Sequence, residues 1–442
     1  MTILVVHNRY RVRGGEDGVF ETECRLLEEA GHKVVRYEKD NRDIPDRGGR
    51  LGLALRTIWN PRTYCEIRAI IRAERPDVVH CHNTFPLVSP SVYWAAAREG
   101  VPVVQTLHNY RLACLDGYLF REGHVCEDCL GRTPWRGVCR RCYRDSRAQS
   151  FVAAAMLLVH RLLGTWRCKV ARYIALTDFA KAKFVQAGLP ADKIVVKPNA
   201  FAPPAQTRPA LASGSRNLGI SESRGENPRI RESENSASLR VVYLGRLSPE
   251  KGVDILLRAW ALLDNGSDVA DHPALSSSIQ HSAFSIQHCS LSIIGSGPEE
   301  DALRSLAASL GIASSVSFLG ALPRDQALAA LSSASLLVLP SVCYETFGLT
   351  VLEAASQGVP AVVTNIGSQA SLVQDGITGR LVPPGDPAAL AAALRNLLAD
   401  PVALHRMGAA ARAAFEASDC APARNLARLL AVYASCGTPH DA

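Results

Sequence analysis

The chain has 442 residues, of which 47% are hydrophobic and 21% charged, and its formal net charge at pH 7 is +7. This length predicts two to three domains of roughly 150 residues each, with room for a large hydrophobic core. The mild positive charge suits an anionic substrate or membrane surface without requiring nucleic acid, and no uncharged apolar run reaches the roughly 18 residues that a membrane span needs.

Apolar segments alternate with helical patterns through most of the chain, which predicts parallel βα units. In the first half, we expect strands at residues 2–7, 33–37, 77–82, 102–108, 173–176 and 194–197, and helices at 15–30, 90–98 and 178–187. In the second half, we expect strands at residues 239–245, 291–294, 316–319, 336–339, 361–364 and 380–382. The sequence therefore predicts an α/β protein with two doubly wound, Rossmann-like domains.

Two segments interrupt this alternation. Residues 203–238 are rich in Ser, Arg, Glu, Asn, Pro and Gly, and this composition predicts a disordered linker. Residues 264–290 contain a repeated Ser-Ile-Gln-His, which indicates a duplicated loop insert without a role of its own. We expect domains at residues 1–202 and 239–419, followed by a C-terminal helix and tail at residues 420–442.

Two features of the first domain lie where predicted strands end. Gly14 and Gly15 stand at a strand-to-helix turn, where glycines let backbone amides approach a ligand, although a tight turn alone would also use them. His108 ends the strand 102–108, and His80 and His82 end an earlier one. Ligands of α/β sheets bind at such carboxyl ends, whereas a lone histidine is more often a core or surface residue.

The second domain opens with a cation pair between a strand and a helix. Arg246 and Lys251 offer a planar fork and a mobile charge to a phosphate, although both could be solvated surface cations. Gly295 and Gly297 form another glycine turn after a strand, which is a weak signal by itself because it is not a full G-x-G-x-x-G. No Asp-x-Asp metal motif stands in a strand-end loop, so we expect cations and helix N-termini to balance the charge of a phosphate without a metal.

Residues 336–368 read as strand, loop, short helix and strand. Glu345 and Glu353 lie eight residues apart, so a helix that starts just after Glu345 would turn both carboxylates towards one cleft. The alternative is that Glu345 caps the helix and Glu353 is a solvated surface residue.

The segment Glu-Thr-Phe-Gly-Leu-Thr-Val-Leu-Glu, with a Gly-Val-Pro that follows it, resembles retaining glycosyltransferases of the GT-B fold, glycosyltransferase family four. The paired glycines, the strand-end histidine and the Gly-Arg-x-x-x-x-Lys-Gly pattern occur in the order of that family. The resemblance implies two domains that face each other across a cleft. It also implies that the helical run over residues 400–435 crosses back to the first domain.

The resemblance also implies roles for individual residues. Glu345 would stabilise the developing oxocarbenium charge, His108 would hydrogen-bond the donor sugar, and Glu353 would hold the ribose. The donor-binding positions that it implies are Gly14, Gly15, Arg246, Lys251, Gly295, Gly297, Phe347, Gly348, Leu349 and Glu353. The implied partners are a nucleotide-sugar donor and a glycan or lipid-linked acceptor, with no cofactor for catalysis.

Five cysteines cluster between residues 114 and 142. Without a visible secretion signal, two C-x-x-C units indicate a four-ligand metal site rather than disulfides. Zinc in a structural role is the expected ion, and an iron–sulfur cluster is the less favoured one. A double knuckle would use Cys126, Cys129, Cys139 and Cys142. The pattern of relatives with such an insert, here 110–146, instead implies Cys114, Cys126, Cys129 and Cys142, which we favour.

Other functional classes remain alternatives. The arginines around the cysteines allow a nucleic-acid-binding protein with a zinc module, but no aromatic-rich surface for base stacking is evident, and we expect no nucleic-acid partner. A sugar-nucleotide epimerase would share the fold. The helix at residues 150–166 either packs in the first domain or lies on a membrane surface. We expect a cytoplasmic protein, with peripheral contact at the inner membrane face as an option.

Overall fold

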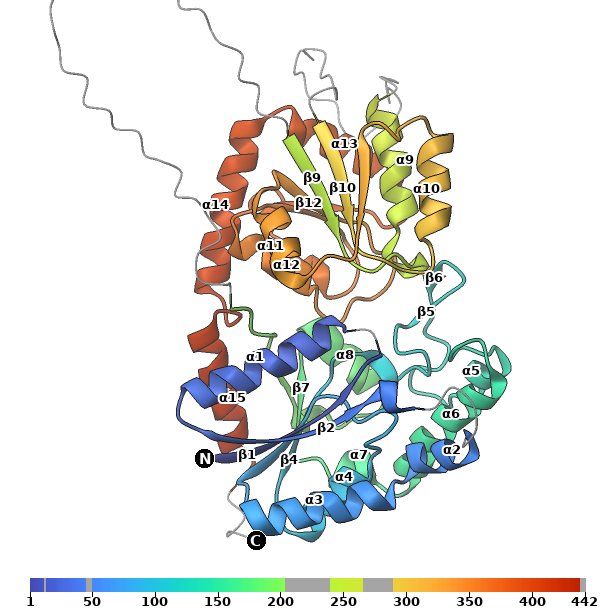
Figure 1. Cartoon of the computed structure of the whole chain (residues 1–442), viewed down its shortest axis with the longest axis vertical. Helices are drawn as coiled ribbons and strands as arrows, with labels where there is room; N and C mark the ends of the chain where they lie inside the picture. Colours follow the sequence, from blue (N-terminus) through green and yellow to red (C-terminus); the bar gives the residue numbers. More distant parts are fainter. Residues whose placement is uncertain (12, 45–49, 203–238, 265–288, 438–442) are drawn as a thin grey trace, which may run out of the picture.

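The computed structural model describes residues 1–11, 13–44, 50–202, 239–264 and 289–437. Two α/β domains are stacked along the long axis of the molecule, the first below and the second above in Figure 1. The predicted linker at 203–238 and most of the predicted insert at 264–290 lie outside the described residues.

The first domain is built on a parallel sheet with the order β2-β1-β3-β4-β7-β8. Its strands are β1 (Thr2–Arg9), β2 (Lys33–Asp40), β3 (Val78–Cys81), β4 (Val103–Thr106), β7 (Arg172–Ala175) and β8 (Ile194–Val196). Every residue of β3 and β4 is buried, as expected for strands that helices cover on both faces. All six strands overlap the predicted ones. The sheet order reverses between β1 and β3.

The second domain repeats the design with the order β11-β10-β9-β12-β13-β14, also parallel. Its strands are β9 (Leu239–Leu244), β10 (Cys289–Ile294), β11 (Val316–Gly320), β12 (Leu336–Leu339), β13 (Ala361–Thr364) and β14 (Gly379–Val382). Here the order reverses between β9 and β12. Ligands of doubly wound sheets bind at such reversals, outside the carboxyl ends of the strands.

Helices connect the strands in both domains. The first domain contains α1 (Gly15–Glu29), α2 (Arg50–Ile58), α3 (Pro61–Glu74), α4 (Ser91–Arg98), α5 (Trp135–Cys139), α6 (Arg147–Leu162), α7 (Thr165–Cys168) and α8 (Asp178–Gln186). A short hairpin of β5 (Phe120–Arg121) and β6 (His124–Val125) lies in the cysteine-rich insert. The second half of the chain contains α9 (Val253–Asp264), α10 (Glu300–Ser309), α11 (Arg324–Ser332), α12 (Leu349–Ser356), α13 (Pro387–Leu398), α14 (Pro401–Ala417) and α15 (Pro422–Ala434).

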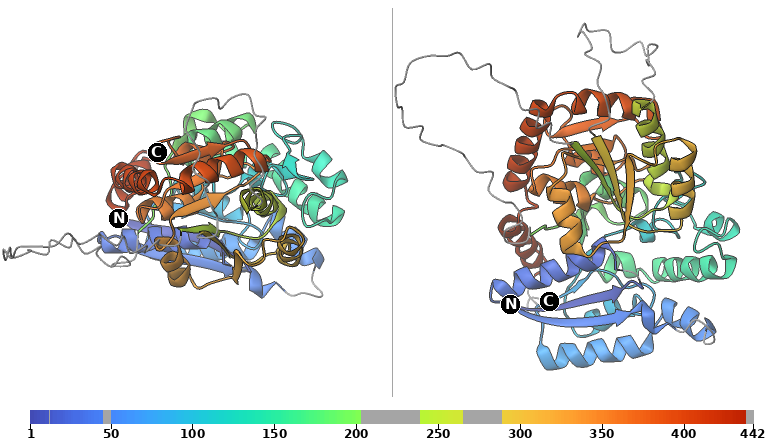
Figure 2. Two further views of the ribbon diagram at one scale, coloured as in Figure 1. Left: turned by 90° about the horizontal axis from the view of Figure 1, so that it is seen from above. Right: turned by 45° about the horizontal axis from the view of Figure 1, so that its top comes forward.

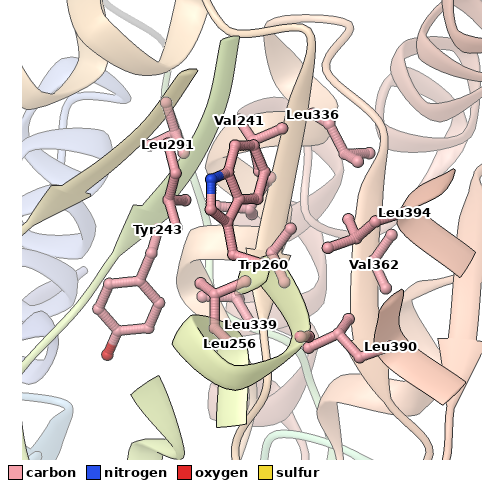
Figure 3. Packing of buried hydrophobic residues seen from close by; sticks show 14 of the residues in the cluster. Val241, Tyr243, Leu256, Trp260, Leu291, Leu336, Leu339, Val362, Leu390 and Leu394 are labelled. Carbon is pink, nitrogen blue, oxygen red and sulfur yellow. The ribbon is translucent and has the colours of Figure 1, made fainter. Parts of the chain in front are cut away.

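The core of the second domain centres on Trp260 of α9. Its indole stands among side chains of β9, β10 and β12 (Figure 3). Leu390 and Leu394 come from α13, the helix that packs against α9, and lie in the same cluster. Trp260 is fully buried, and its ring N–H donates to Ser315 Oγ at 3.1 Å. The polar atom of this buried ring is therefore satisfied.

The predicted helical run over residues 400–435 is two helices. α14 ends at Ala417, and Pro422 begins α15, a position where its missing N–H is harmless. α15 crosses to the first domain, as the resemblance implied, and packs beside α1 (Figures 1 and 2). Its Leu429, Val432 and Tyr433 join a hydrophobic cluster with residues of β1 and α1.

Candidate active site between the two domains

The carboxyl ends of the two sheets face each other and touch. Thr346 Oγ1, in the loop after β12, donates to the backbone oxygen of His108 at 2.7 Å. At the start of α1, a Cβ added to Gly15 would lie 3.5 Å from Leu349 Cδ2. Residues predicted for the donor site therefore come from both domains and meet at one interface.

A charged pair lies at the strand-order reversal of the second sheet. Lys251 Nζ, after β9, is 2.5 Å from Glu345 Oε1, after β12, and Ser341 Oγ donates to the same oxygen at 3.0 Å. Both charged side chains keep some exposure, 24% for Lys251 and 19% for Glu345. Burial disfavours the charged form of Lys251, but Glu345 prevails and holds the lysine pKa above its ordinary value.

Arg246 also belongs to the loop after β9. Its guanidinium is paired with Glu250, and Nε donates to Ser248 Oγ at 3.1 Å. The guanidinium carbon lies 5.2 Å from the centre of the Tyr118 ring, which comes from the cysteine-rich insert of the first domain. Arg246 remains half-exposed at the interface, where a planar fork can bind a phosphate.

The two predicted glutamates have different surroundings. The expectation that a helix begins just after Glu345 is wrong, because α12 begins at Leu349 behind the N-cap Gly348. Glu345 therefore lies in the loop, whereas Glu353 is buried in α12 with Oε1 3.1 Å from Arg324 Nη2. Burial raises the pKa of Glu353 to about 7, although the charge of Arg324 acts in the opposite direction.

The glycine turns of the second domain are required by close packing of backbone on backbone. A Cβ on Gly295 would come 1.8 Å from the Gly245 oxygen, and one on Gly297 would come 2.1 Å from the Leu247 oxygen. Leu247 also donates its backbone N–H to the Ser296 oxygen at 3.0 Å. These contacts fix the loop that carries Arg246 and Lys251, so both glycines support the donor side structurally.

The three predicted donor-binding positions after Thr346 are Phe347, Gly348 and Leu349, and they differ in how much side chain they expose. The Phe347 side chain is 4% exposed and packs in a hydrophobic cluster that also contains Leu176 of the first domain. Gly348 has a φ of +110°, which a side chain rarely tolerates. Leu349 is half-buried against the same cluster. Phe347 thus has only its backbone to offer to a donor.

The start of α1 carries two acidic residues, Glu16 and Asp17, that the sequence analysis did not single out. Gly14 donates its N–H to Asp17 Oδ2 at 2.8 Å, which caps the helix, and Asp17 Oδ1 lies 2.8 Å from His7 Nε2. Glu16 accepts from the Tyr10 hydroxyl at 2.8 Å, and its other carboxylate oxygen is buried with no hydrogen-bond partner among the described residues. Burial raises the pKa of Glu16 to about 7. Acidic residues are common in the first turn of a helix, so the sequence alone does not mark these two as part of the interface.

His108 is partly exposed and lies against the buried histidine His82. His108 Nε2 lies 2.9 Å from His82 Nδ1, and the two rings stack with centres 5.2 Å apart. His80 instead bonds Thr106 and Tyr433 on its two nitrogens. Burial holds the pKa of both His82 and His108 well below the ordinary value, so both rings are neutral near pH 7.

The insert brings the favoured set of cysteines to one pocket. Cys114, Cys126, Cys129 and Cys142 all line it, whereas Cys139 is exposed and does not. Among the described residues, no three of these sulfur atoms all lie within 4.8 Å of one another. Within the described ranges, the group whose potential ligand atoms all lie within 4.8 Å of one another is Glu23, His80 and His82.

Two family models match the chain, one in each half. Residues 11–200 match the Glycosyl transferase 4-like domain. Residues 226–414 match Glycosyl transferases group 1. The matches cover the second sheet, every strand of the first sheet except β1, and both loops that form the Lys251–Glu345 pair.

Curated relatives agree with these matches. A D-inositol 3-phosphate glycosyltransferase from Streptomyces coelicolor is 31% identical over 346 residues, which are 76% of this chain and 64% of that protein. A glycogen synthase from Mycobacterium tuberculosis is 38% identical over 172 residues, 39% of this chain and 37% of that protein. The chain spans less than two thirds of the length of either relative.

Solved structures share the fold at low sequence identity. Sucrose-phosphate synthase from Thermosynechococcus elongatus has a TM-score of 0.65 and 18% identity, with 98% of both chains covered. Anabaena HepE in complex with UDP and glucose has a TM-score of 0.62 and 18% identity, with 98% of this chain and 100% of that one covered. These likenesses show the GT-B fold, and the two domain matches, which together span most of the chain, show that it belongs to the glycosyltransferases of the family-four type.

Proposed function

We propose that the protein is a retaining glycosyltransferase that moves a sugar from a nucleotide-sugar donor to a glycan or lipid-linked acceptor. The observation that carries this proposal is the Lys251–Glu345 pair at the strand-order reversal of the second sheet, joined through Thr346 to His108 of the first. A cation for a diphosphate and a carboxylate for a sugar thus lie side by side where α/β domains bind ligands.

The contacts suggest how the roles divide. Lys251 and Arg246 bind the diphosphate, which takes the electron pair of the broken sugar–oxygen bond. A diphosphate competes with Glu345 for Lys251, so donor binding frees this carboxylate to stabilise positive charge on the sugar. Glu353 holds the ribose hydroxyl groups, and His108 holds the sugar. These cations neutralise the leaving group by themselves, so we expect catalysis to need no metal at the diphosphate.

The first experiment is a thermal-shift panel of nucleoside diphosphates and nucleotide sugars. UDP and UDP-glucose come first, because Anabaena HepE structures were solved with them. A binding nucleotide stabilises the fold by about 3 kcal/mol at a hundredfold excess over Kd. Donors that bind are then tested for transfer, and proton NMR of the product's anomeric centre distinguishes retention from inversion.

Other outcomes of this panel would contradict the proposal. Donor turnover that needs no acceptor would indicate an epimerase. Salt-dependent binding of RNA or DNA without any response to nucleotides would indicate the nucleic-acid alternative. An inverted product would overturn the retaining assignment but would leave the assignment as a glycosyltransferase unchanged.

We also propose a structural zinc ion on Cys114, Cys126, Cys129 and Cys142. Their convergence on one pocket supports this set, and four thiolates would close a tetrahedral site once the sulfur atoms draw together around the ion. The same insert places Tyr118 against Arg246, so a zinc ion that fixes the insert would also steady the diphosphate side of the interface.

Metal analysis of the full chain tests the zinc proposal. We expect about one zinc per chain and no iron–sulfur absorbance. Cys126→Ser should lose the metal, and the matched control Cys139→Ser should keep it. If Cys139→Ser also loses the ion while Cys114→Ser keeps it, the double knuckle is the correct set. Reduced, active protein without metal would refute the site.

For the acceptor, we propose bacterial surface polysaccharide or glycolipid assembly, with peripheral membrane contact through α2 and α6. These helices pack together, and α6 buries one face in the first domain, yet large apolar side chains stay exposed, including Leu51, Leu55 and Leu162. No helix among the described residues is long and apolar enough to span a membrane.

Arginines near these helices, such as Arg144 and Arg147, are exposed and suit anionic lipid headgroups. We expect the protein to co-sediment with anionic liposomes at low salt and less at high salt, and Leu162→Asp to weaken this binding. A protein that stays in the supernatant at low salt has no such contact.

A further inference from the structure

A chain of buried polar side chains runs from His108 into the first domain. Lys197 Nζ is 2.5 Å from Glu23 Oε1 on α1, and these side chains are 1% and 2% exposed. The second carboxylate oxygen, Glu23 Oε2, is 3.4 Å from His82 Nε2. His82 Nδ1 in turn lies 2.9 Å from His108 Nε2. The chain therefore joins a buried ion pair to the histidine at the domain interface.

The existing contacts of these residues argue against a metal at Glu23, His80 and His82. His80 Nδ1 and Nε2 are each 2.8 Å from a hydroxyl, that of Tyr433 and that of Thr106 respectively. The Lys197 cation already neutralises Glu23. A ring with both nitrogens engaged and a carboxylate with its own cation make a poor ligand set, so proton placement is the better explanation of the cluster.

The contact between Glu23 and His82 determines which nitrogen of His82 carries the proton. Glu23 Oε2 and His82 Nε2 are both buried, and neither has a hydrogen-bond partner among the described residues. Their separation of 3.4 Å exceeds a good hydrogen bond, but a shift of a few tenths of an ångström satisfies both. A proton on His82 Nε2 faces the carboxylate favourably, whereas a lone pair there would be repelled.

This choice is passed on to His108. With its proton on Nε2, His82 presents a lone pair at Nδ1, so the 2.9 Å contact requires a proton on His108 Nε2. His108 is neutral, as argued above from its lowered pKa, and therefore has one ring proton only. Its Nδ1, which makes no hydrogen bond to any described residue, is left with a lone pair.

We propose that Glu23 and His82 are positioning residues that fix His108 as a hydrogen-bond acceptor for a hydroxyl group of the donor sugar. This inference rests on the proposed glycosyl transfer and assigns the direction of the hydrogen bond within it. His108 then selects a sugar with a hydroxyl at this place, because a hydroxyl can donate to Nδ1 whereas an ether or phosphate oxygen cannot.

The ring nitrogens of the wild-type full chain provide the first test. Long-range ¹H–¹⁵N spectra distinguish a protonated from an unprotonated ring nitrogen, and signals missing in His108→Gln and His82→Gln assign the two rings. We expect both rings to carry their proton on Nε2 between pH 6 and 8. A proton on Nδ1 of either ring, or a doubly protonated ring in this range, would overturn the proposal. This readout needs no substrate, so it stands even if glycosyl transfer fails.

Glu23→Gln provides the second test. Lys197 will hold the amide oxygen, which turns the amide NH₂ towards His82 Nε2 and should move the proton to Nδ1 in both rings. We expect kcat/KM for transfer to fall roughly 10- to 100-fold while nucleoside diphosphate affinity stays within about twofold. Unchanged ring-nitrogen signals and unchanged transfer would count against the proposal.

The matched control is Glu29→Gln, an exposed glutamate of the same helix that pairs with Arg25. It should change neither the ring nitrogens nor the rate. If Glu23→Gln does not fold because Lys197 loses its partner, the wild-type spectra still decide. If no donor supports transfer in the wild type, the proposed function fails and the proton positions remain as measured.

Discussion

At the residue scale, the interface is organised by carboxylates with specific partners. Glu345 Oε1 accepts from both Lys251 and Ser341, so the contact with Ser341 keeps the carboxylate in position when a diphosphate takes Lys251. Such a preorganised charge can stabilise a developing cation without reorientation during the reaction. Glu353 has a different partner, Arg324.

Replacing Glu345 should therefore affect turnover more than binding. We expect Glu345→Gln to lower kcat on the order of 10²- to 10³-fold, since a preorganised charge is lost at the transition state. Affinity for the nucleoside diphosphate should stay similar or rise slightly, because Lys251 loses a competing anion. Steady-state kinetics and calorimetry measure the two effects, with the exposed Glu416→Gln as control. Wild-type turnover in the variant would remove Glu345 from catalysis.

The raised pKa of Glu353 predicts a pH-dependent stability. The native carboxyl holds its proton up to about pH 7, whereas its ordinary value is 4.5. The native state therefore binds more protons in this window, so stability falls as pH rises from about 4.5 to 7 and is level above it.

Glu353→Gln stays neutral and should lack this dependence. Relative to the variant, the wild type should lose at most about 3 kcal/mol of unfolding free energy across the window. Urea unfolding of both proteins at pH 5, 6, 7 and 8 measures the difference. A difference that stays constant with pH would show that Glu353 is ionised throughout.

The sequence predicted the positions of the site better than their partners. Glycines, His108, the cations and Glu345 all follow strands, and parallel strands bring their carboxyl ends to one edge, so their gathering was predictable. The pairing of Lys251 with Glu345 joins residues 94 apart, and Glu23 with Lys197 joins residues 174 apart. No local pattern encodes such contacts, because they depend on how the loops pack.

At the element scale, the loops after β9 and β10 form one packed unit. Gly297 has no room for a side chain beside the Leu247 oxygen, and the loop it supports carries Arg246 and Lys251. From the sequence we interpreted this turn as a ligand contact. Glycines that face a ligand and glycines that face another loop give the same sequence pattern, so the two cannot be told apart without the structure.

This packing predicts the effect of adding one methyl group. Gly297→Ala should destabilise the protein by about 1–3 kcal/mol, as overpacking does, and weaken nucleoside diphosphate binding. Gly52→Ala is the matched control, because nothing lies within 4 Å of its added Cβ and a helix prefers alanine there. Thermal unfolding and calorimetry give the two readouts. Equal stability of both variants would mean that the loops can separate freely.

The elements of the first domain were predictable to different degrees. The sheet strands β1, β3, β4, β7 and β8 contain short apolar runs that stand out in the sequence, whereas the edge strand β2 is largely charged. The hairpin of β5 and β6 has two residues per strand, too short for any periodicity to show. In the second half of the chain, Pro422 marks the break between α14 and α15. Helix-forming residues on both sides of it made residues 400–435 look like one helical run.

At the scale of the whole molecule, α15 makes the two domains interdependent. It follows the second domain in sequence, yet Tyr433 donates to or accepts from His80 at 2.8 Å and Leu429 is buried against the first sheet. Asn425 also donates to the Pro198 oxygen at 2.8 Å. The first domain therefore completes its core only when the end of the chain has returned to it.

Truncating Leu429 should accordingly destabilise the first domain from the other end of the sequence. Leu429 is 1% exposed beside Ile3 and Phe20, so Leu429→Ala should cost about 2–5 kcal/mol of unfolding free energy. Hydrogen exchange should quicken in β1 and β3 first, because their amides lie under the lost contact. The matched control Leu398→Ala, buried in the second core, should instead quicken exchange in the second sheet. If Leu429→Ala leaves the protection of β1 unchanged, α15 is only an attachment and the first domain is stable without it.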